Sequence, residues 1–358
     1  MRRRIGALVL CAALVLSGCG WMDGSYVSVQ PHQVGLDQTA EGSARAVSSY
    51  TELRGALIGM IDSGTEEGLF SLAEYPRDEA LRDMDRAVEY ALGTYPVGAY
   101  AVESIDYDFG TGLGASALSV RITYRRSREQ IEGIRTVRWV SGARKEVEDA
   151  LDECTDSLVL QIAGYQEADY NGIIRDYAER NPDRVMEVPG VTVRVFPEQG
   201  DTRVVELSFH YRTDRQELRA MREQVQPVFS SAALYVSGQA EDRTKFHQLH
   251  TFLTERFEHY TIESTVTPAW SLLCQGIGDS RAFAQVYAAM CSRIDLEARV
   301  VSGTLNGESR WWNLVKTGDV WYHLDLLASR SFEPLTDDMM VGYEWDRAAY
   351  PAADGAAE

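Results

Sequence analysis

A helix start followed by three short strands, within residues 268–325, most constrains what this chain can fold into. Gly278-Asp279-Ser280 predicts the start of a helix, because the Asp279 carboxylate can accept hydrogen bonds from free backbone N–H groups there. Apolar residues then recur at the three-and-four spacing of one helical face: Phe283, Val286, Tyr287 and Met290. Strands are expected at 297–305, 311–316 and 320–325, with a turn at Thr317-Gly318-Asp319. We expect this sheet to pack against the helix.

These residues resemble the transglutaminase-like superfamily of papain-type thiol enzymes. That family has Gly-x-Gly-x-Cys-x-x-aromatic-Ala at a helix start, then Val-Ser-Gly, His-Ala-Trp-Asn and Trp-Tyr-x-x-Asp. The corresponding segments here are Gly276-Ile277-Gly278-Asp279-Ser280, Val301-Ser302-Gly303, Arg310-Trp311-Trp312-Asn313 and Trp321-Tyr322-His323-Leu324-Asp325. The resemblance extends upstream to a helix at 244–260, with His250 at a position where the family has a histidine, and downstream to Tyr350-Pro351.

The resemblance implies a Cys-His-Asp triad, and two of its three residue types are replaced. Ser280 stands at the cysteine position and Arg310 at the histidine position, whereas Asp325 is retained. A serine needs a base even more than a cysteine does, and a guanidinium stays protonated at any relevant pH. Asp279 adds negative charge where an oxyanion would develop. The sequence therefore predicts degenerate triad positions at Ser280, Arg310 and Asp325.

Two substitutes for the missing groups remain open. His323 precedes Asp325 by two residues and could serve as a base, and Cys274 is a weaker replacement nucleophile. We expect Arg310 and Asp325 to form an ion pair, because the planar guanidinium fork matches a carboxylate bidentately. The residues expected to line the former cleft are Trp270, Asp279, Trp312, Asn313 and His323.

The N-terminus predicts a lipoprotein signal peptide over residues 1–19. Met1-Arg2-Arg3-Arg4 is positively charged, and residues 5–16 are apolar but too few to span a bilayer stably. Leu16-Ser17-Gly18-Cys19 fits a lipobox, in which the cysteine becomes the lipidated first residue. The alternative is an ordinary secretory signal that contains a cysteine. The lipoprotein reading predicts a membrane anchor at Cys19, on the extracytoplasmic face of a bacterial cell membrane, and a flexible tether over residues 20–44.

Charge and cysteine content exclude several classes of site. A formal net charge of -19 argues against nucleic acid as a partner, because an acidic surface repels phosphates. No motif indicates a cofactor, and no spacing of histidines or cysteines indicates a metal site. Beyond the signal, Cys154, Cys274 and Cys291 remain, so that a Cys274–Cys291 disulfide and buried free thiols are both open.

Residues 45–235 are expected to form two α+β modules in tandem, over 45–140 and 141–235, each reading α-β-α-β-β. The main sign of an internal repeat is that Tyr124-Arg125-Arg126-Ser127-Arg128 echoes Tyr211-Arg212-Thr213-Asp214-Arg215, each after an alternating strand. The arginines near Tyr124 could bind an acidic ligand, or they could pair with acidic residues across strands. The predicted class is thus α+β, with a transglutaminase-like domain at 236–351 and a tail at 352–358.

The function predicted from these features is non-catalytic. We expect a surface lipoprotein that binds or scaffolds protein, peptide or cell-wall material through the former cleft or the modules. The alternative is an active amide hydrolase or acyltransferase that uses Ser280 or a substitute nucleophile. A base within hydrogen-bond reach of Ser280 would distinguish the two.

The lipid anchor can be tested directly at Cys19. Replacing Cys19 with Ala removes the thiol that would carry the lipid, so radiolabelled fatty acid should no longer enter the protein and an unprocessed precursor should accumulate. Incorporation of label into the Cys19→Ala variant would refute the lipobox assignment.

Overall fold

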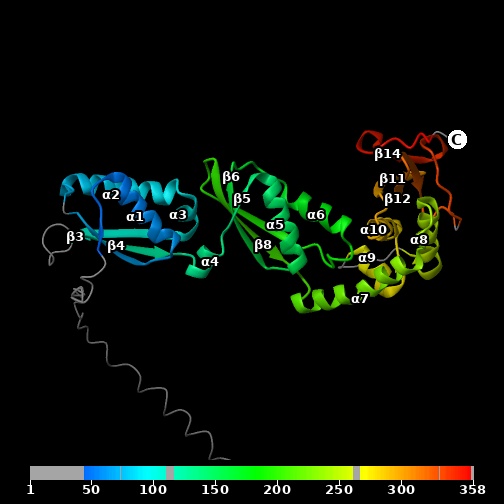
Figure 1. Cartoon of the computed structure of the whole chain (residues 1–358), viewed down its shortest axis with the longest axis horizontal. Helices are drawn as coiled ribbons and strands as arrows, with labels where there is room; N and C mark the ends of the chain where they lie inside the picture. Colours follow the sequence, from blue (N-terminus) through cyan, green and yellow to red (C-terminus); the bar gives the residue numbers. More distant parts are fainter. Residues whose placement is uncertain (1–43, 73, 110–116, 261–266, 330, 356–358) are drawn as a thin grey trace, which may run out of the picture. The chain divides into compact units, whose positions relative to one another are not determined.

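The computed structural model describes residues 44–72, 74–109, 117–260, 267–329 and 331–355 (Figure 1). The predicted signal peptide, Cys19 and almost all of the predicted tether lie outside the described residues. Over the described ranges, no helix is both long and apolar enough to cross a membrane. The predicted α+β class is confirmed, since helices pack on three four-stranded sheets.

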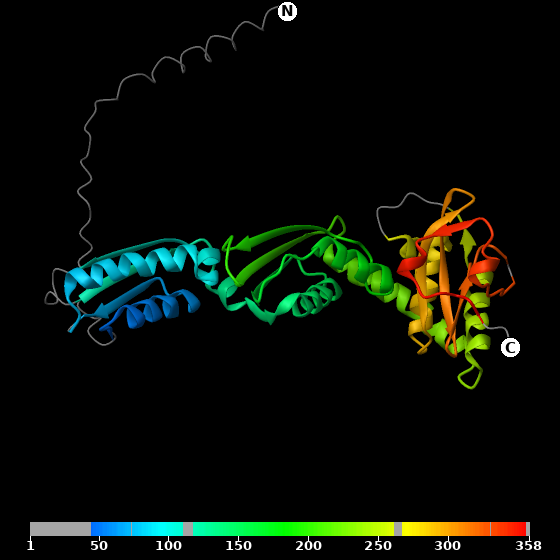
Figure 2. The same cartoon turned by 90° about the horizontal axis from the view of Figure 1, so that it is seen from above.

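The first sheet has the strand order β1-β2-β4-β3. One face of it is buried, because Leu118, Val120 and Ile122 alternate with exposed or half-buried polar residues along β4. Helices α1 and α2 contact each other and pack on this face (Figure 2). The elements are β1 (Arg45–Ala46), α1 (Tyr50–Asp62), β2 (Glu67–Ser71), α2 (Arg77–Gly93), α3 (Pro96–Ala101), β3 (Val102–Phe109) and β4 (Ala117–Tyr124).

The second sheet has the order β5-β6-β8-β7. Its buried face carries alternating residues such as Val205, Leu207 and Phe209 of β8, which pack against α5 and α6. The elements are α4 (Arg128–Glu132), β5 (Arg135–Arg138), α5 (Trp139–Glu153), β6 (Ser157–Ala163), α6 (Tyr170–Arg180), β7 (Gly190–Phe196) and β8 (Thr202–His210).

The two sheets share one arrangement of strands, with β4 and β8 in the same place in each. The internal repeat itself stays a prediction. Each unit also begins with a strand that the α-β-α-β-β reading omits, because β1 and β5 are too short and polar to show a hydrophobic period. β5 pairs in parallel with β6, so residues 135–138 belong to the second sheet rather than to the predicted first module.

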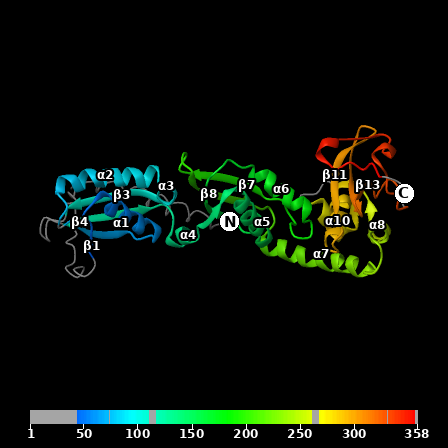
Figure 3. The ribbon, with the colours of Figure 1, turned by 45° about the horizontal axis from the view of Figure 1, so that its top comes forward.

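The third sheet, of order β13-β12-β11-β14, has helix α10 on one face (Figure 3). The other face carries Trp312 and Leu314, which pack with Met340 and Ala353 of the C-terminal segment. The remaining elements are α8 (Asp242–Arg256), β9 (Glu258–His259), α9 (Pro268–Trp270), a π-helical turn (Ser271–Gln275), β10 (Ile277–Gly278), α10 (Ser280–Ser292), β11 (Ala298–Leu305), β12 (Glu308–Thr317), β13 (Val320–Leu324), η3 (Asp337–Met339), β14 (Tyr343–Trp345) and η4 (Arg347–Ala349).

Contacts at both predicted limits of the C-terminal domain cross those limits, and the division itself stays a prediction. Helix α7 (Arg215–Tyr235), which the sequence analysis placed in the second module, buries Leu218, Val225 and Phe229 in one core with α8 and α10. At the other end, Ala353 is fully buried and its N–H donates to Asp337 Oδ1 at 3.2 Å, so the predicted tail at 352–358 begins inside the domain.

Two glycine replacements should shift stability in opposite directions. A Cβ on Gly303 of β11 would lie 2.1 Å from the carbonyl oxygen of Glu344 in β14, so Gly303→Ala should separate the two strands and lower the free energy of unfolding. A Cβ on Gly55, inside α1, meets no atom of another element within 4 Å. Gly55→Ala should therefore raise the free energy of unfolding by about 0.5–1 kcal/mol. Denaturant titration followed by circular dichroism measures both. A tolerated Gly303→Ala would contradict the close approach of β14.

Candidate active site

Ser280 occupies the first position of α10. The predicted cap is confirmed, since Asp279 Oδ1 accepts the N–H of Ala282 at 2.8 Å. The Ser280 side chain is buried and its Oγ accepts the backbone N–H of Trp311 at 3.2 Å. Over the described ranges, no histidine or carboxylate hydrogen-bonds to this hydroxyl. The helix start could stabilise an anion at this position, but no neighbouring group is placed to remove the serine proton.

The predicted ion pair between Arg310 and Asp325 is confirmed. Arg310 Nε donates to Asp325 Oδ2 at 2.7 Å and Nη2 donates to Oδ1 at 2.9 Å, which is the bidentate geometry. Two further groups donate hydrogen bonds to the Asp325 carboxylate: the Leu327 N–H to Oδ1 at 2.9 Å and the Tyr343 hydroxyl to Oδ2 at 2.8 Å. Only 1% of the Asp325 side chain is exposed, so its charge is held by four donors rather than by water. Burial and this bond raise the pKa of Tyr343.

The ion pair and Ser280 belong to opposite faces of the sheet. The Trp311 ring lies 4.8 Å from the guanidinium of Arg281 in α10, and Asn313 donates to the Ala284 carbonyl of the same helix at 2.9 Å. Because side chains alternate along a strand, Arg310 and Trp312 face away from α10. The Trp312 ring contacts Tyr343, and Tyr343 donates a hydrogen bond to Asp325, so Trp312 and the ion pair lie on the same face of the sheet.

His323 cannot replace the missing base. Its Nδ1 accepts the Trp312 Nε1–H at 2.9 Å, so the neutral ring carries its proton on Nε2 and donates it to Asp337 at 2.8 Å. Burial lowers the pKa of His323, although Asp337 opposes this shift. Nδ1 therefore joins β13 to β12 and Nε2 joins β13 to the C-terminal segment, so both nitrogens are engaged and the rescue that the sequence left open is disfavoured in this arrangement.

Three predicted cleft-lining residues are enclosed in the protein. Trp312, Asn313 and His323 are each 0% exposed, so they do not line an open cleft. The C-terminal segment covers Trp312 and His323, whereas α10 covers Asn313. Asp279 caps α10, and Trp270 is half-buried against the core of the helices. Neither Asp279 nor Trp270 is brought to Arg310 by a described contact.

The described cysteines are all free thiols. The Cys274–Cys291 disulfide that the sequence left open is therefore not formed. Cys291 is buried beside Tyr287, and burial raises the pKa of Cys274, which disfavours the reactive thiolate. Within the same residues, no group of histidine, cysteine, aspartate or glutamate could hold a metal ion.

Comparison with known proteins identifies the C-terminal region. The sequence profile of the transglutaminase-like superfamily matches residues 230–326. These residues form a transglutaminase-like domain. No curated protein matches the chain. The helix start at Ser280 and the strand carrying Arg310 both lie inside the matched region, and the assignment of Ser280 and Arg310 to the triad positions stays a prediction.

Similar solved structures include a TGase, with 9% identity, a TM-score of 0.27, and coverage of 58% of this chain and 60% of that one. A protein from Cytophaga hutchinsonii proposed to be a cysteine protease shows 14% identity, a TM-score of 0.25, and coverage of 41% and 66%. A protein from Parabacteroides distasonis proposed to be a protease shows 8% identity, a TM-score of 0.24, and coverage of 60% of this chain and 47% of that one. The chain spans less than two thirds of each structure. Likenesses at this level carry no argument about activity.

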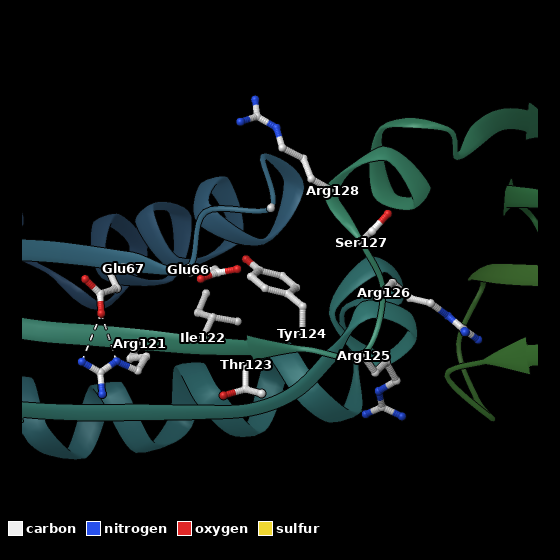
Figure 4. A pocket seen from close by; sticks show the side chains of 11 residues that line it. Glu66, Glu67, Arg121, Ile122, Thr123, Tyr124, Arg125, Arg126, Ser127 and Arg128 are labelled. Carbon is white, nitrogen blue, oxygen red and sulfur yellow. Dashed lines mark hydrogen bonds and ion pairs between the residues drawn. The ribbon is translucent and has the colours of Figure 1, made fainter.

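A depression of about 570 Å³ in the first module gathers the arginines that follow β4 (Figure 4). Arg121 pairs with Glu67, its cross-strand partner in β2, and Arg128 pairs with Glu132. Arg126 pairs with Glu206 and Arg125 donates to the carbonyl of Val102. Each of these guanidinium groups therefore has a partner inside the protein, although only Arg121–Glu67 is a cross-strand pair, and this pairing disfavours an anion site.

His250 is a buried group whose environment sequence reasoning missed. It lies on α8, is 1% exposed, and neither ring nitrogen has a hydrogen-bond partner among the described residues. Burial and the nearby His247 lower its pKa from 6.5 to about 4. The sequence of α8 alone could not predict that His250 is buried, because the Phe332 ring that packs on it comes from a segment distant in the sequence.

The ion pair should stabilise the transglutaminase-like domain. Arg310→Ala and Asp325→Ala should each lower the free energy of unfolding by about 3–5 kcal/mol, because each leaves a buried charge unpaired. The double variant should lose less than the sum. Removing Arg121 or Glu67, an exposed pair with 66% and 69% of the side chains accessible, is the matched control and should cost about 0–1 kcal/mol. Additive losses at 310 and 325 would contradict the coupling.

Acid should destabilise the domain through His250. A folded-state pKa below the unfolded value means that the unfolded chain binds the proton more readily, so this contribution is complete above pH 6.5 and is lost as the pH falls towards 4. Unfolding titrations across this range should show a shallower pH dependence for His250→Leu than for the native chain. Replacing the exposed His259 with Gln should leave the dependence unchanged. Equal slopes for His250→Leu and the native chain would refute this.

Proposed function

We propose that this chain is a membrane-anchored extracytoplasmic lipoprotein whose transglutaminase-like domain binds or scaffolds rather than catalyses. Its partner would be protein, peptide or cell-wall material. The family match supports the fold of the domain, and the sequence of residues 1–19 supports the anchor. The role itself rests on the site.

The observation that carries the proposal is the separation of Ser280 from any base. Arg310, at the family's histidine position, is a permanent cation already engaged by Asp325. The acid that would orient a catalytic histidine has its oxygens occupied by four donors. A serine hydroxyl without a base is a poor nucleophile, so acyl transfer through Ser280 is disfavoured.

The alternative, an amide hydrolase or acyltransferase, keeps one supporting observation. Ser280 lies at the start of a 13-residue helix, where the dipole favours a developing negative charge. Turnover by that route needs a proton acceptor supplied by the substrate, or a rearranged site.

Assays for amidase, protease and transglutaminase activity distinguish the two proposals. The native chain should show no turnover above background, and Ser280→Ala should change nothing, because no base among the described residues hydrogen-bonds to Ser280. Turnover that disappears in Ser280→Ala would reject the non-catalytic proposal in favour of the hydrolase.

Binding is tested by chemical cross-linking of the intact chain in native membranes. A reproducible partner should be cross-linked through residues 230–326, since the proposal places binding in this domain. Cross-links confined to other regions would reject the role of this domain.

A further inference from the structure

Trp139 is an exposed aromatic ring on a backbone conformation that bulky residues avoid. Its φ is 61°, in the left-handed region, and 58% of the residue is exposed at the start of α5. A tryptophan at positive φ is an outlier, and such conformations persist where the surroundings impose them, often at binding sites. Packing does not explain the residue, because most of its surface faces solvent.

Gly164 makes room for the ring. A Cβ at Gly164 would lie 2.3 Å from one atom of the Trp139 six-membered ring, a distance that side-chain atoms cannot share. The contact follows from the sheet, because Arg138 is paired with Ala163 where β5 and β6 run in parallel. The indole ring of Trp139 therefore packs against the backbone of Gly164.

A depression of about 450 Å³ lies beside this contact: Trp139 does not line it, but Tyr165, the residue after Gly164, does. It is lined by Tyr165, Gln166, Glu167, Val195, Glu198 and Arg203. Arg203 is fixed in place, since its guanidinium lies 4.5 Å from the centre of the Tyr165 ring and its Nε donates to the Gly200 carbonyl at 2.9 Å. Within the described part of the chain, Glu167 and Glu198 have no ion-pair partner, so their oxygens are available to a ligand.

We propose that Trp139 and this depression form a carbohydrate-binding site, which is independent of the function proposed for the C-terminal domain. A pyranose ring presents a face of C–H groups that can stack on an exposed indole, and a rim of hydroxyls that both donate and accept hydrogen bonds. Carboxylates of Glu167 and Glu198 accept, Arg203 donates, and Gln166 does both. Arg203 already covers the Tyr165 ring, so that ring is not open to a cationic ligand.

Titration of the full-length chain in detergent with cellohexaose, chitohexaose and maltohexaose tests the site, with binding followed by calorimetry. At least one hexasaccharide should bind, and Trp139→Asn should weaken it at least tenfold. Asn accepts the left-handed conformation, so the melting temperature should not fall. Gly164→Ala should also weaken binding by displacing the ring. Tyr260→Ala, which removes a ring that is 64% exposed elsewhere, is the control and should leave binding unchanged.

Three results would overturn the proposal. The first is that none of the three hexasaccharides binds. The second is that Trp139→Asn binds as tightly as the native chain, and a lower melting temperature in that variant would then assign Trp139 a structural role. The third is that choline chloride or hexalysine binds at Trp139 in place of the saccharides, which would assign the site to cations.

Discussion

The C-terminal domain depends on how one buried carboxylate is neutralised. Asp325 lies at the end of the sheet and accepts hydrogen bonds from Arg310, Tyr343 and the backbone of Leu327. These donors come from β12, β14 and the segment after β13, so the carboxylate joins both edges of the sheet to its centre. Charge burial is costly without such partners, and the arginine supplies two of the four hydrogen bonds together with the opposite charge. The ion pair of Arg310 with Asp325 therefore stabilises the sheet.

The same sheet face is closed by a second polar connection. His323 accepts from Trp312 and donates to Asp337, whose neighbouring segment carries the buried Ala353. Together with the ion pair, this connection encloses the side chains that would border a cleft on that face. Ser280 lies on the α10 side, where its Oγ accepts a hydrogen bond from the β12 backbone at Trp311.

Local signals were sufficient for the helix start, the strands and the ion pair. The Asp279 cap, the turn at Gly318 and the bidentate match of Arg310 to Asp325 each follow from chemistry within a few residues or between adjacent strands. What failed depended on distant segments. Burial of Trp312 is imposed by β14 and the C-terminal residues, and α7 joins the C-terminal core only because α8 and α10 supply its apolar partners. Periodicity gives the apolar face of an element but not the element that covers it.

The central claim is that Arg310 is held permanently by Asp325 and is not free for chemistry. Solvent exchange of the Arg310 Nε proton, measured by nuclear magnetic resonance, tests it most directly. The account predicts a slowly exchanging signal that becomes fast in Asp325→Asn, whereas Arg121, with 66% of its side chain exposed, exchanges fast throughout. Exchange at Arg310 as fast as at Arg121 in the native chain would contradict the account.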